Sequence, residues 1–345
     1  ITAGAYIESY NGSLTLNAES GDIAVSSGIY GSEGVTLNAL GGITASGDYI
    51  RSYNGSITLT AESGGITAGD FIRSNNASIT LSAAGEITTG LLSSGSSTEL
   101  TASGGTISVS DINSGSNTIL NTSAGSIWTT GTLTAVGSTT LSSSGAIDVQ
   151  GEIYSGDRLS LSAMDTITTS ANLDSNSGDI DLTASSNIEL YGAVQSGGDV
   201  NIAAGGWLIS SRELQSGGSV MLDVYDSMDV GDVRAGLDIS ATSESGNLIV
   251  SGILDSGTDT VLNTESGSIT VSGSGGVQAS GSTTLNAAAD IGLDASVSGS
   301  NVSMEASGVI TTSANVSSYN GGDIEMTAAV RITADGDIAS EGAML

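Results

Sequence analysis

The chain contains no cysteine, proline or histidine, and its six basic residues are all arginine. The absence of cysteine excludes disulfides, zinc–thiolate sites and thiol nucleophiles. The absence of histidine removes the most common general base and the most common metal ligand. Few familiar catalytic sites can be assembled from the residue types that remain.

Positive charge and long apolar runs are also scarce. Six arginines against 37 acidic residues give a formal net charge of −31. Such a chain repels phosphate backbones and anionic membrane surfaces, which argues against nucleic-acid binding. No apolar run approaches the roughly 20 residues that a membrane-spanning helix needs, so no membrane span is expected.

Aromatic residues make up only 3% of the chain, whereas glycine is abundant at 50 residues. A core must therefore be built from isoleucine, leucine, valine and alanine. A glycine- and serine-rich acidic composition is also typical of disordered chains. The hydrophobic content of 38% and its regular placement indicate a folded protein instead.

An internal repeat runs through nearly the whole chain. One repeat reads Gly-Ser-Ile-Thr-Leu-Thr-Ala-Glu-Ser-Gly-Gly-Ile-Thr-Ala over residues 55–68. We took the second apolar residue of the first strand in each repeat as its marker. The 17 markers, with a mean spacing of about 21 residues, are Leu16, Leu37, Leu59, Leu81, Leu100, Leu120, Leu141, Leu161, Leu182, Ile202, Leu222, Ile239, Leu262, Leu285, Met304, Met326 and Leu345. Because no shift in composition interrupts this series, one continuous domain over residues 1–345 is predicted.

Within a repeat, apolar residues alternate with threonine or serine, which is the period of a half-buried β-strand. Three short strands fit each repeat, exemplified by Ile57–Leu59, Ile66–Ala68 and Phe71–Ile72. Glycine and asparagine lie between them, where tight corners need small residues or positive φ.

A repeat of about 21 residues is too short for most paired-helix repeats, and the leucine-rich-repeat spacing is missing. The pattern predicts an all-β, parallel β-helix (solenoid) of about 17 coils, with apolar ladders inside. A rise of about 4.8 Å per coil gives a length near 80 Å. Right-handed coiling is expected by analogy with the handedness of parallel crossovers.

The recurring string Gly-Ser-Ile-Thr-Leu-Thr-Ala followed by Gly-Gly-Ile-Thr-Ala is similar to the repeats of filamentous haemagglutinin and related exoproteins of the two-partner secretion family. The resemblance extends from Ser13–Leu16 to Asp323–Met326. It implies a right-handed β-helix secreted to the bacterial surface, where it forms an adhesin shaft or fibre. The family's Asn-Pro-Asn-Gly secretion motif cannot occur in a proline-free chain. The resemblance therefore implies a shaft whose host receptor or matrix is bound by a domain outside this chain.

The two ends of the sequence fit one another. Ile1 and Ala3 match the start of a second strand, whereas Met344 and Leu345 match a first strand. Neither end resembles the polar capping repeat of a free solenoid. These four residues are the expected end-to-end contacts, either with the rest of a longer chain or with other copies. Two hypotheses follow: a shaft within an adhesin, or a subunit of an extracellular filament built by head-to-tail stacking.

The densest acidic cluster comprises Asp223, Asp226, Asp229 and Asp232. Converging carboxylates bind Ca²⁺ through oxygen, so weak calcium binding is the one cofactor expectation. Residues three apart point in different directions around a coil, however, and the glycine-rich calcium-solenoid motif is absent. A solvated acidic face is the alternative.

Catalysis is not expected, because no acid–base constellation stands out. Some β-helix enzymes cut acidic polysaccharides with aspartates and basic residues. The nearest approximations here are Asp157 with Arg158 and Asp232 with Arg234. A strongly acidic chain without substrate-binding insertions should repel such substrates.

Two arginines, Arg51 and Arg73, occupy equivalent places in neighbouring repeats and should stack on one edge, near Tyr10 and Tyr53. The pair is suited to a carboxylate or an acidic sugar. Alternatively, the local acids Asp48 and Asp70 neutralise both guanidinium groups.

Outward strand positions usually carry polar residues. Apolar exceptions gather at Ile209, Met221, Ile249 and Val261, with Ile119 and Trp128 earlier in the chain. Such residues are candidates for lateral contact with another copy or a partner. A register shift of one residue would instead turn them inward.

Overall fold

The computed structural model describes residues 1–273 and 275–344. These residues form 48 β-strands and no helix, so none of them belongs to a helix that is long and apolar enough to cross a membrane. They gather into two compact units, Ile1–Asn176 and Ser177–Leu345, called unit 1 and unit 2 below.

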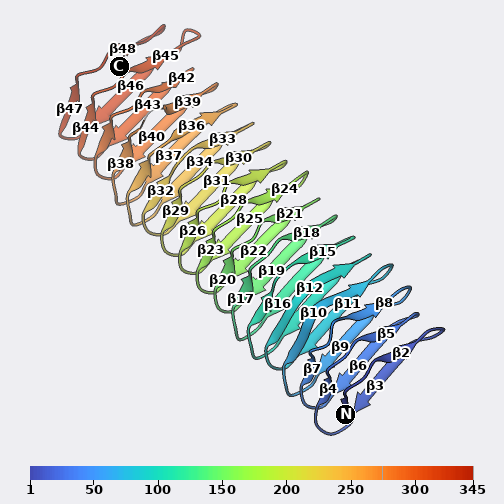
Figure 1. Ribbon diagram of the computed structural model, residues 1–345. Helices are drawn as coiled ribbons and strands as arrows, with labels where there is room; N and C mark the ends of the chain where they lie inside the picture. Colours follow the sequence, from blue (N-terminus) through green and yellow to red (C-terminus); the bar gives the residue numbers. More distant parts are fainter. Residues whose placement is uncertain (274, 345) are drawn as a thin grey trace. The chain divides into compact units, whose positions relative to one another are not determined.

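Each unit is a parallel β-solenoid, as the repeat predicted. Most coils carry a five-residue strand followed by two shorter strands, and equivalent strands pair in parallel from coil to coil (Figure 1). We name the resulting stacks the first, second and third faces, in chain order within a coil. Corners of at most five residues join the strands.

The first face of unit 1 contains β3 (Leu14–Ala18), β6 (Val35–Ala39), β9 (Ile57–Ala61), β11 (Ile79–Ala83), β13 (Thr98–Ala102), β16 (Thr118–Thr122), β19 (Thr139–Ser143) and β22 (Leu159–Ala163). Its second face contains β1 (Thr2–Ala3), β4 (Ile23–Val25), β7 (Ile43–Ala45), β14 (Ile107–Val109), β17 (Ile127–Thr129), β20 (Ile147–Val149) and β23 (Ile167–Thr169). Its third face contains β2 (Ile7–Ser9), β5 (Ile29–Gly31), β8 (Ile50–Ser52), β15 (Ile112–Ser114), β18 (Leu133–Ala135), β21 (Ile153–Ser155) and β24 (Leu173–Ser175). Two longer strands run across the second and third faces, β10 (Ile66–Ser74) and β12 (Ile87–Ser94).

The first face of unit 2 contains β25 (Ile180–Ala184), β28 (Val200–Ala204), β31 (Val220–Val224), β34 (Ile239–Ser243), β37 (Thr260–Thr264), β40 (Thr283–Ala287), β43 (Val302–Ala306) and β46 (Ile324–Ala328). Its second face contains β26 (Ile188–Leu190), β29 (Leu208–Ser210), β32 (Met228–Val230), β35 (Leu248–Val250), β38 (Ile269–Val271), β41 (Ile291–Leu293), β44 (Val309–Thr312) and β47 (Arg331–Ala334). Its third face contains β27 (Val194–Ser196), β30 (Leu214–Ser216), β33 (Val233–Ala235), β36 (Ile253–Ser256), β39 (Gly276–Ala279), β42 (Val297–Gly299), β45 (Val316–Ser318) and β48 (Ile338–Ala339).

The period-two pattern places alternate residues inside. In β9, Ile57, Leu59 and Ala61 are buried, whereas the threonines between them face outward. Each buried leucine or isoleucine contributes about 1.5–3 kcal/mol relative to an exposed one. Each described marker is the third residue of a five-residue strand on the first face, with one correction. Ile239 is the first inward residue of β34, and Ala241 holds the third place.

Hydroxyl groups share the interior with the aliphatic ladders, which the sequence reading did not foresee. A column of serines ends most strands of the third face, and most of their hydroxyl groups donate to a carbonyl oxygen of the adjoining corner, whereas the buried Ser52 hydroxyl has no partner among the described residues. The Ser74 hydroxyl donates to the Gly55 carbonyl at 2.9 Å, and the Ser216 hydroxyl to that of Gly198 at 2.7 Å. These bonds satisfy hydroxyl groups that would otherwise be buried without partners.

Acidic and amide side chains at many corners bind the backbone of the next coil. The Asp179 carboxylate accepts the Asp199 N–H at 2.9 Å, and the Asp199 carboxylate accepts the Ser219 N–H at 2.7 Å. Asn301 makes the equivalent bond to the Asp323 N–H at 3.0 Å. Part of the negative charge therefore serves to hold successive corners in register.

Candidate functional sites

Aromatic side chains and two arginines gather on the third face of the first coils of unit 1. The register pairs Glu8 with Tyr30, Tyr30 with Arg51, and Arg51 with Arg73, so these four residues form one outward column. Alternate residues of a strand share a face, so the side chains two positions before each arginine project beside this column. A shallow pocket of about 290 Å³ is lined by Tyr30, Asp48, Tyr49, Arg51 and Phe71.

A glycine allows two of the tyrosines to meet across an intervening coil. The rings of Tyr6 and Tyr49 stack with centroids 6.1 Å apart and planes 28° from parallel. A Cβ atom at Gly28 would lie 2.7 Å from both rings, so only glycine leaves them room. The Tyr6 hydroxyl also donates to the Asp48 carboxylate at 3.3 Å. Tyr6 therefore contacts both Tyr49 and Asp48, two of the residues that line the pocket.

Two phenols in this region, those of Tyr49 and Tyr10, have raised pKa values. Burial raises the pKa of Tyr49 above its ordinary value, and the charge of Glu8 raises it further. A hydrogen bond from the Tyr10 hydroxyl to Glu8 raises the pKa of Tyr10. Both phenols therefore stay protonated at neutral pH and can donate hydrogen bonds.

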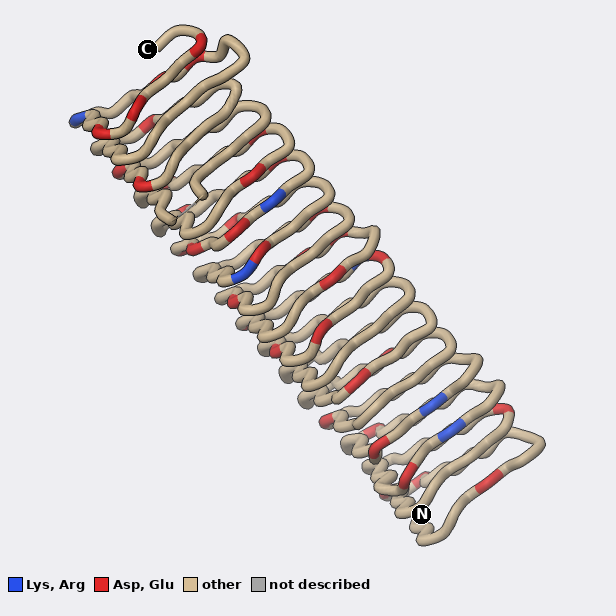
Figure 2. Tube along the Cα trace, turned by 45° about the horizontal axis from the view of Figure 1, so that its top comes forward, with Lys and Arg blue, Asp and Glu red and all other residues tan. Residues whose placement is uncertain are grey.

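The two arginines lie directly opposite each other on neighbouring coils (Figure 2). Of the described residues, none forms an ion pair within 4.0 Å of either guanidinium group. Asp48 and Asp70, which were predicted to neutralise the arginines, therefore make no salt bridge with them. On the third face of unit 2, by contrast, Arg234 pairs with Glu213 of the preceding coil.

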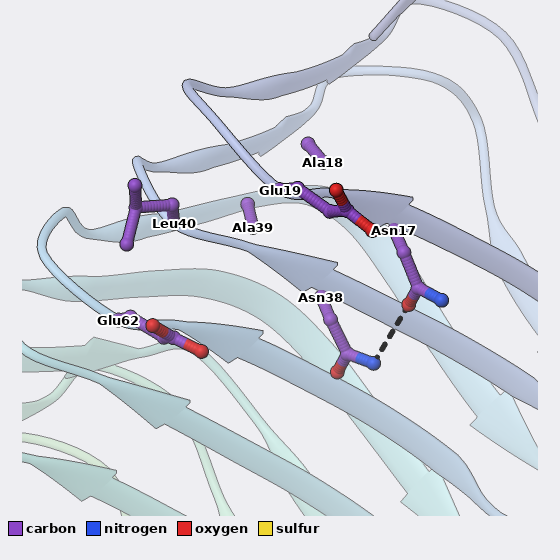
Figure 3. A pocket seen from close by; sticks show the side chains of 7 residues that line it. All are labelled: Asn17, Ala18, Glu19, Asn38, Ala39, Leu40 and Glu62. Carbon is purple, nitrogen blue, oxygen red and sulfur yellow. Dashed lines mark hydrogen bonds between the residues drawn. The ribbon is translucent and has the colours of Figure 1, made fainter.

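A second hollow lies where the first face of unit 1 turns its corner (Figure 3). Asn17 and Asn38 occupy the same register position, and the Asn38 side-chain NH₂ group donates to the Asn17 amide oxygen at 2.9 Å. This hollow of about 320 Å³ is lined by Asn17, Ala18, Glu19, Asn38, Ala39, Leu40 and Glu62. The hydrogen bond between the two amides aligns neighbouring coils. The two asparagines therefore have a structural role that needs no ligand.

The aspartates of the predicted calcium cluster do not converge. Asp223 projects from the first face and Asp229 from the second, whereas Asp226 and Asp232 lie in corners. Asp229 accepts the Ser251 hydroxyl at 3.0 Å, and Asp232 accepts the Ile253 N–H at 2.9 Å. Within residues 1–273 and 275–344, no three acidic side chains are placed to share one metal ion. Weak calcium binding by the acidic surface stays a prediction.

The lateral-contact candidates point outward, as their register predicted, but they do not form one patch. Met221 and Val261 lie on the first face with Ser240 between them in the same column. Ile209 and Ile249 lie on the second face, separated by Asp229. Met221 is 55% exposed and Val261 37%, while the two isoleucines are half-buried. In unit 1, Ile119 and Trp128 are exposed on the first and second faces.

The end-to-end candidates belong to strand-like segments. Ala3 pairs with Val25 in β4, while Ile1 is exposed. Met344 bridges to Ile324 and is 59% exposed. Leu345 lies outside the described residues. Contact through these residues stays a prediction.

Of the two acid–arginine pairs considered for polysaccharide cleavage, Asp157, Arg158 and Asp232 lie in corners, and Arg234 is the outward residue of β33. Asp232 and Arg234 direct their side chains to different partners, the Ile253 N–H and Glu213 respectively. The carbonyl oxygens of Asp157 and Arg158 accept hydroxyls of the interior serine column, from Ser175 and Ser155. These residues are thus integrated into the coil framework.

Comparison with known proteins identifies no relative: no protein family, no curated protein and no solved structure matches the chain. The resemblance to two-partner secretion exoproteins therefore stays a prediction from the repeat.

Proposed function

We propose that the chain is a structural, non-catalytic segment of a secreted or surface-displayed bacterial adhesin. The observation that carries the proposal is the uniformity of the coils. In each unit, the same three strands pair in parallel from coil to coil, and corners of at most five residues leave little room for a substrate-binding insertion. Each coil therefore repeats the same backbone bonds and the same aliphatic ladders, which suits a segment that resists mechanical force.

The exterior also supports this role. Its strands carry mostly threonine, serine and acidic residues, and the chain has a net charge of −31. Like charge limits sideways association between copies, so a solenoid with many strands can remain dispersed. Acidic residues occur along the coils of both units (Figure 2). Adhesion, cell–cell contact and biofilm contact are the processes that such a segment would serve.

Single-molecule pulling of the full chain tests the mechanical role. The chain has no cysteine, so one cysteine added at each end provides unique attachment points. Release of one coil of about 21 residues should lengthen the chain by about 70 Å, because an extended residue spans at most about 3.3–3.6 Å. We expect a series of such steps. A single release of the whole length at low force would contradict the proposed mechanical role.

Antibody labelling of the producing bacterium tests the location. Labelling of intact cells, or recovery of the protein from the culture fluid, is the expected result. A cytoplasmic protein labelled in parallel controls for cell lysis. Labelling that appears only after the cells are permeabilised would contradict an extracellular role.

A further inference from the structure

The third face of the first coils carries a combination of groups found at no other place in the described residues. Six of the twelve aromatic side chains lie within the first 71 positions: Tyr6, Tyr10, Tyr30, Tyr49, Tyr53 and Phe71. Two of the six arginines of the chain stand next to them. The rest of the exterior is dominated by small polar and acidic residues, so this concentration requires its own physical account.

The two arginines form an electrostatically unfavourable pair. Arg51 and Arg73 are direct register partners in adjacent parallel strands, which lie about 4.8 Å apart. Like charges placed directly opposite each other destabilise a sheet. Asp48, the acid that lines the pocket, accepts a hydrogen bond from the Tyr6 hydroxyl and forms no ion pair with either arginine within 4.0 Å. Two adjacent guanidinium groups can together bind one carboxylate with several charge-assisted hydrogen bonds.

The rings beside the arginines supply flat, partly apolar surfaces. Tyr49 and Phe71 each stand two residues before an arginine, and Tyr30 stands beside Arg51 in the column. All three rings are half-buried, so each keeps an accessible part. The C–H groups of a sugar ring carry partial positive charge and pack against the negative face of an aromatic ring. Phenol and carboxylate groups in the same pocket can bind sugar hydroxyl groups.

We infer that this pocket, lined by Tyr30, Asp48, Tyr49, Arg51 and Phe71 and extended by Arg73, binds an oligosaccharide whose sugars carry carboxylate groups. The aromatic rings pack against the sugar faces, and the two arginines share a carboxylate. A volume of about 290 Å³ lies at the small end of the range for ligand pockets, which suits one or two sugar units. The site adds a ligand to the proposed structural role and does not depend on that role.

Isothermal titration of the full chain with a defined probe tests the site. The probe is a tetrasaccharide of glucuronic acid and N-acetylglucosamine, and its carboxyl-reduced form is the matched neutral ligand. We expect the acidic probe to bind and the reduced probe to bind at least about tenfold more weakly, because charge-assisted hydrogen bonds are lost. Lack of binding by the acidic probe, or equal binding of both probes, would overturn the inference.

Variants locate the site. Arg51→Gln combined with Arg73→Gln should weaken binding at least about tenfold, and Tyr49→Ala should weaken it as well. Arg234→Gln is the matched control, because Arg234 occupies the same outward position on the third face but already pairs with Glu213. Circular dichroism confirms that each variant is folded. Unchanged affinity in the double variant would overturn the assignment to this pocket.

An acidic peptide distinguishes the class of ligand. A hexaglutamate peptide presents carboxylates without sugar rings, so it should bind more weakly than the tetrasaccharide. A peptide that binds as tightly as the sugar would overturn the assignment to a saccharide.

Discussion

Tyr6 and Tyr49 stack on each other across Gly28, although the coil that contains Gly28 lies between them. Their centroids are 6.1 Å apart, and the contact is possible only because the intervening residue has no side chain. Three successive coils are thus joined by one aromatic contact on the outside of the solenoid, in addition to the backbone ladders within it.

Replacing Gly28 with alanine should separate these rings. The new Cβ atom would lie 2.7 Å from both, so the rings must move apart. We expect the tyrosine signal in near-ultraviolet circular dichroism to change, with little change in the far-ultraviolet strand signal. Gly292→Ala is the matched control, because a Cβ atom there meets nothing within 4 Å. Equal effects of the two substitutions would contradict the stacking.

The aliphatic ladder should be far more sensitive than the outer surface. Leu81→Ala removes a fully buried side chain from the middle of β11, and we expect it to lower the free energy of unfolding by about 2–5 kcal/mol. Thr80→Ala, on the outward side of the same strand, should change it by less than about 0.5 kcal/mol. Chemical denaturation measures both, and comparable losses would mean that the assigned register is incorrect.

Substitution of a buried threonine should raise the free energy of unfolding instead of lowering it. Thr129 is fully buried, its hydroxyl group has no hydrogen-bond partner among the described residues, and its register neighbours are Val109 and Val149. Valine has nearly the same shape, so Thr129→Val should raise the free energy of unfolding by about 1–3 kcal/mol.

Ser114 provides the reverse case. Its buried hydroxyl group lies 2.8 Å from the Thr98 hydroxyl oxygen and 3.1 Å from the Asn117 carbonyl oxygen, so it has hydrogen-bond partners on both sides. Ser114→Ala should therefore destabilise the protein by about 1–3 kcal/mol. Thermal denaturation of the two variants compares an unpartnered hydroxyl with a partnered one, and shifts in the same direction would refute the distinction.

Two aspartates should respond to pH in opposite ways. Hydrogen bonds from the Thr258 hydroxyl and the Asp259 N–H lower the pKa of Asp238. Its contribution to stability is present above the unfolded pKa of about 3.9 and is lost as the pH falls through the lower folded pKa. Burial raises the pKa of Asp174, so its ionisation opposes folding at neutral pH.

The corresponding asparagine variants measure this difference. At pH 7, Asp238→Asn should be less stable than Asp174→Asn, and the difference should shrink as the pH falls below the ordinary aspartate pKa. Both substitutions remove one negative charge from a chain at −31, so they share any general relief of repulsion. Denaturation midpoints between pH 7 and pH 2.5 give the comparison. Parallel curves for the two variants would contradict the assigned environments.

The coil architecture was predictable because it depends on a period. Alternation such as Ile57-Thr58-Leu59 fixes which side chains face inward, and the spacing of the markers fixes the coil. Misplacement of Ile239 shows the limit of that reasoning. Both Ile239 and Ala241 point inward, so alternation alone cannot choose between them.

The interior serines and the tyrosine stack were not predicted, for different physical reasons. Polarity alone predicts that serine faces outward, but the Ser74 hydroxyl donates to a carbonyl oxygen at the corner and can therefore be buried. The stack depends on contact between coils that are not adjacent in the repeat. A signal was present nonetheless: Tyr-Ile-Glu-Ser-Tyr at residues 6–10 recurs as Tyr-Ile-Arg-Ser-Tyr at residues 49–53, two coils later.

The corner bonds from Asp179 to Asp199 and from Asp199 to Ser219 join residues 20 positions apart, and the strand pairings within each unit join residues 19 to 23 positions apart. Folding of either unit therefore needs no meeting of distant segments. A finished coil offers the next one a complete template of backbone partners, so structure can grow along the chain in the order in which its residues become available. Such a protein can fold coil by coil, while most of its chain is still unfolded.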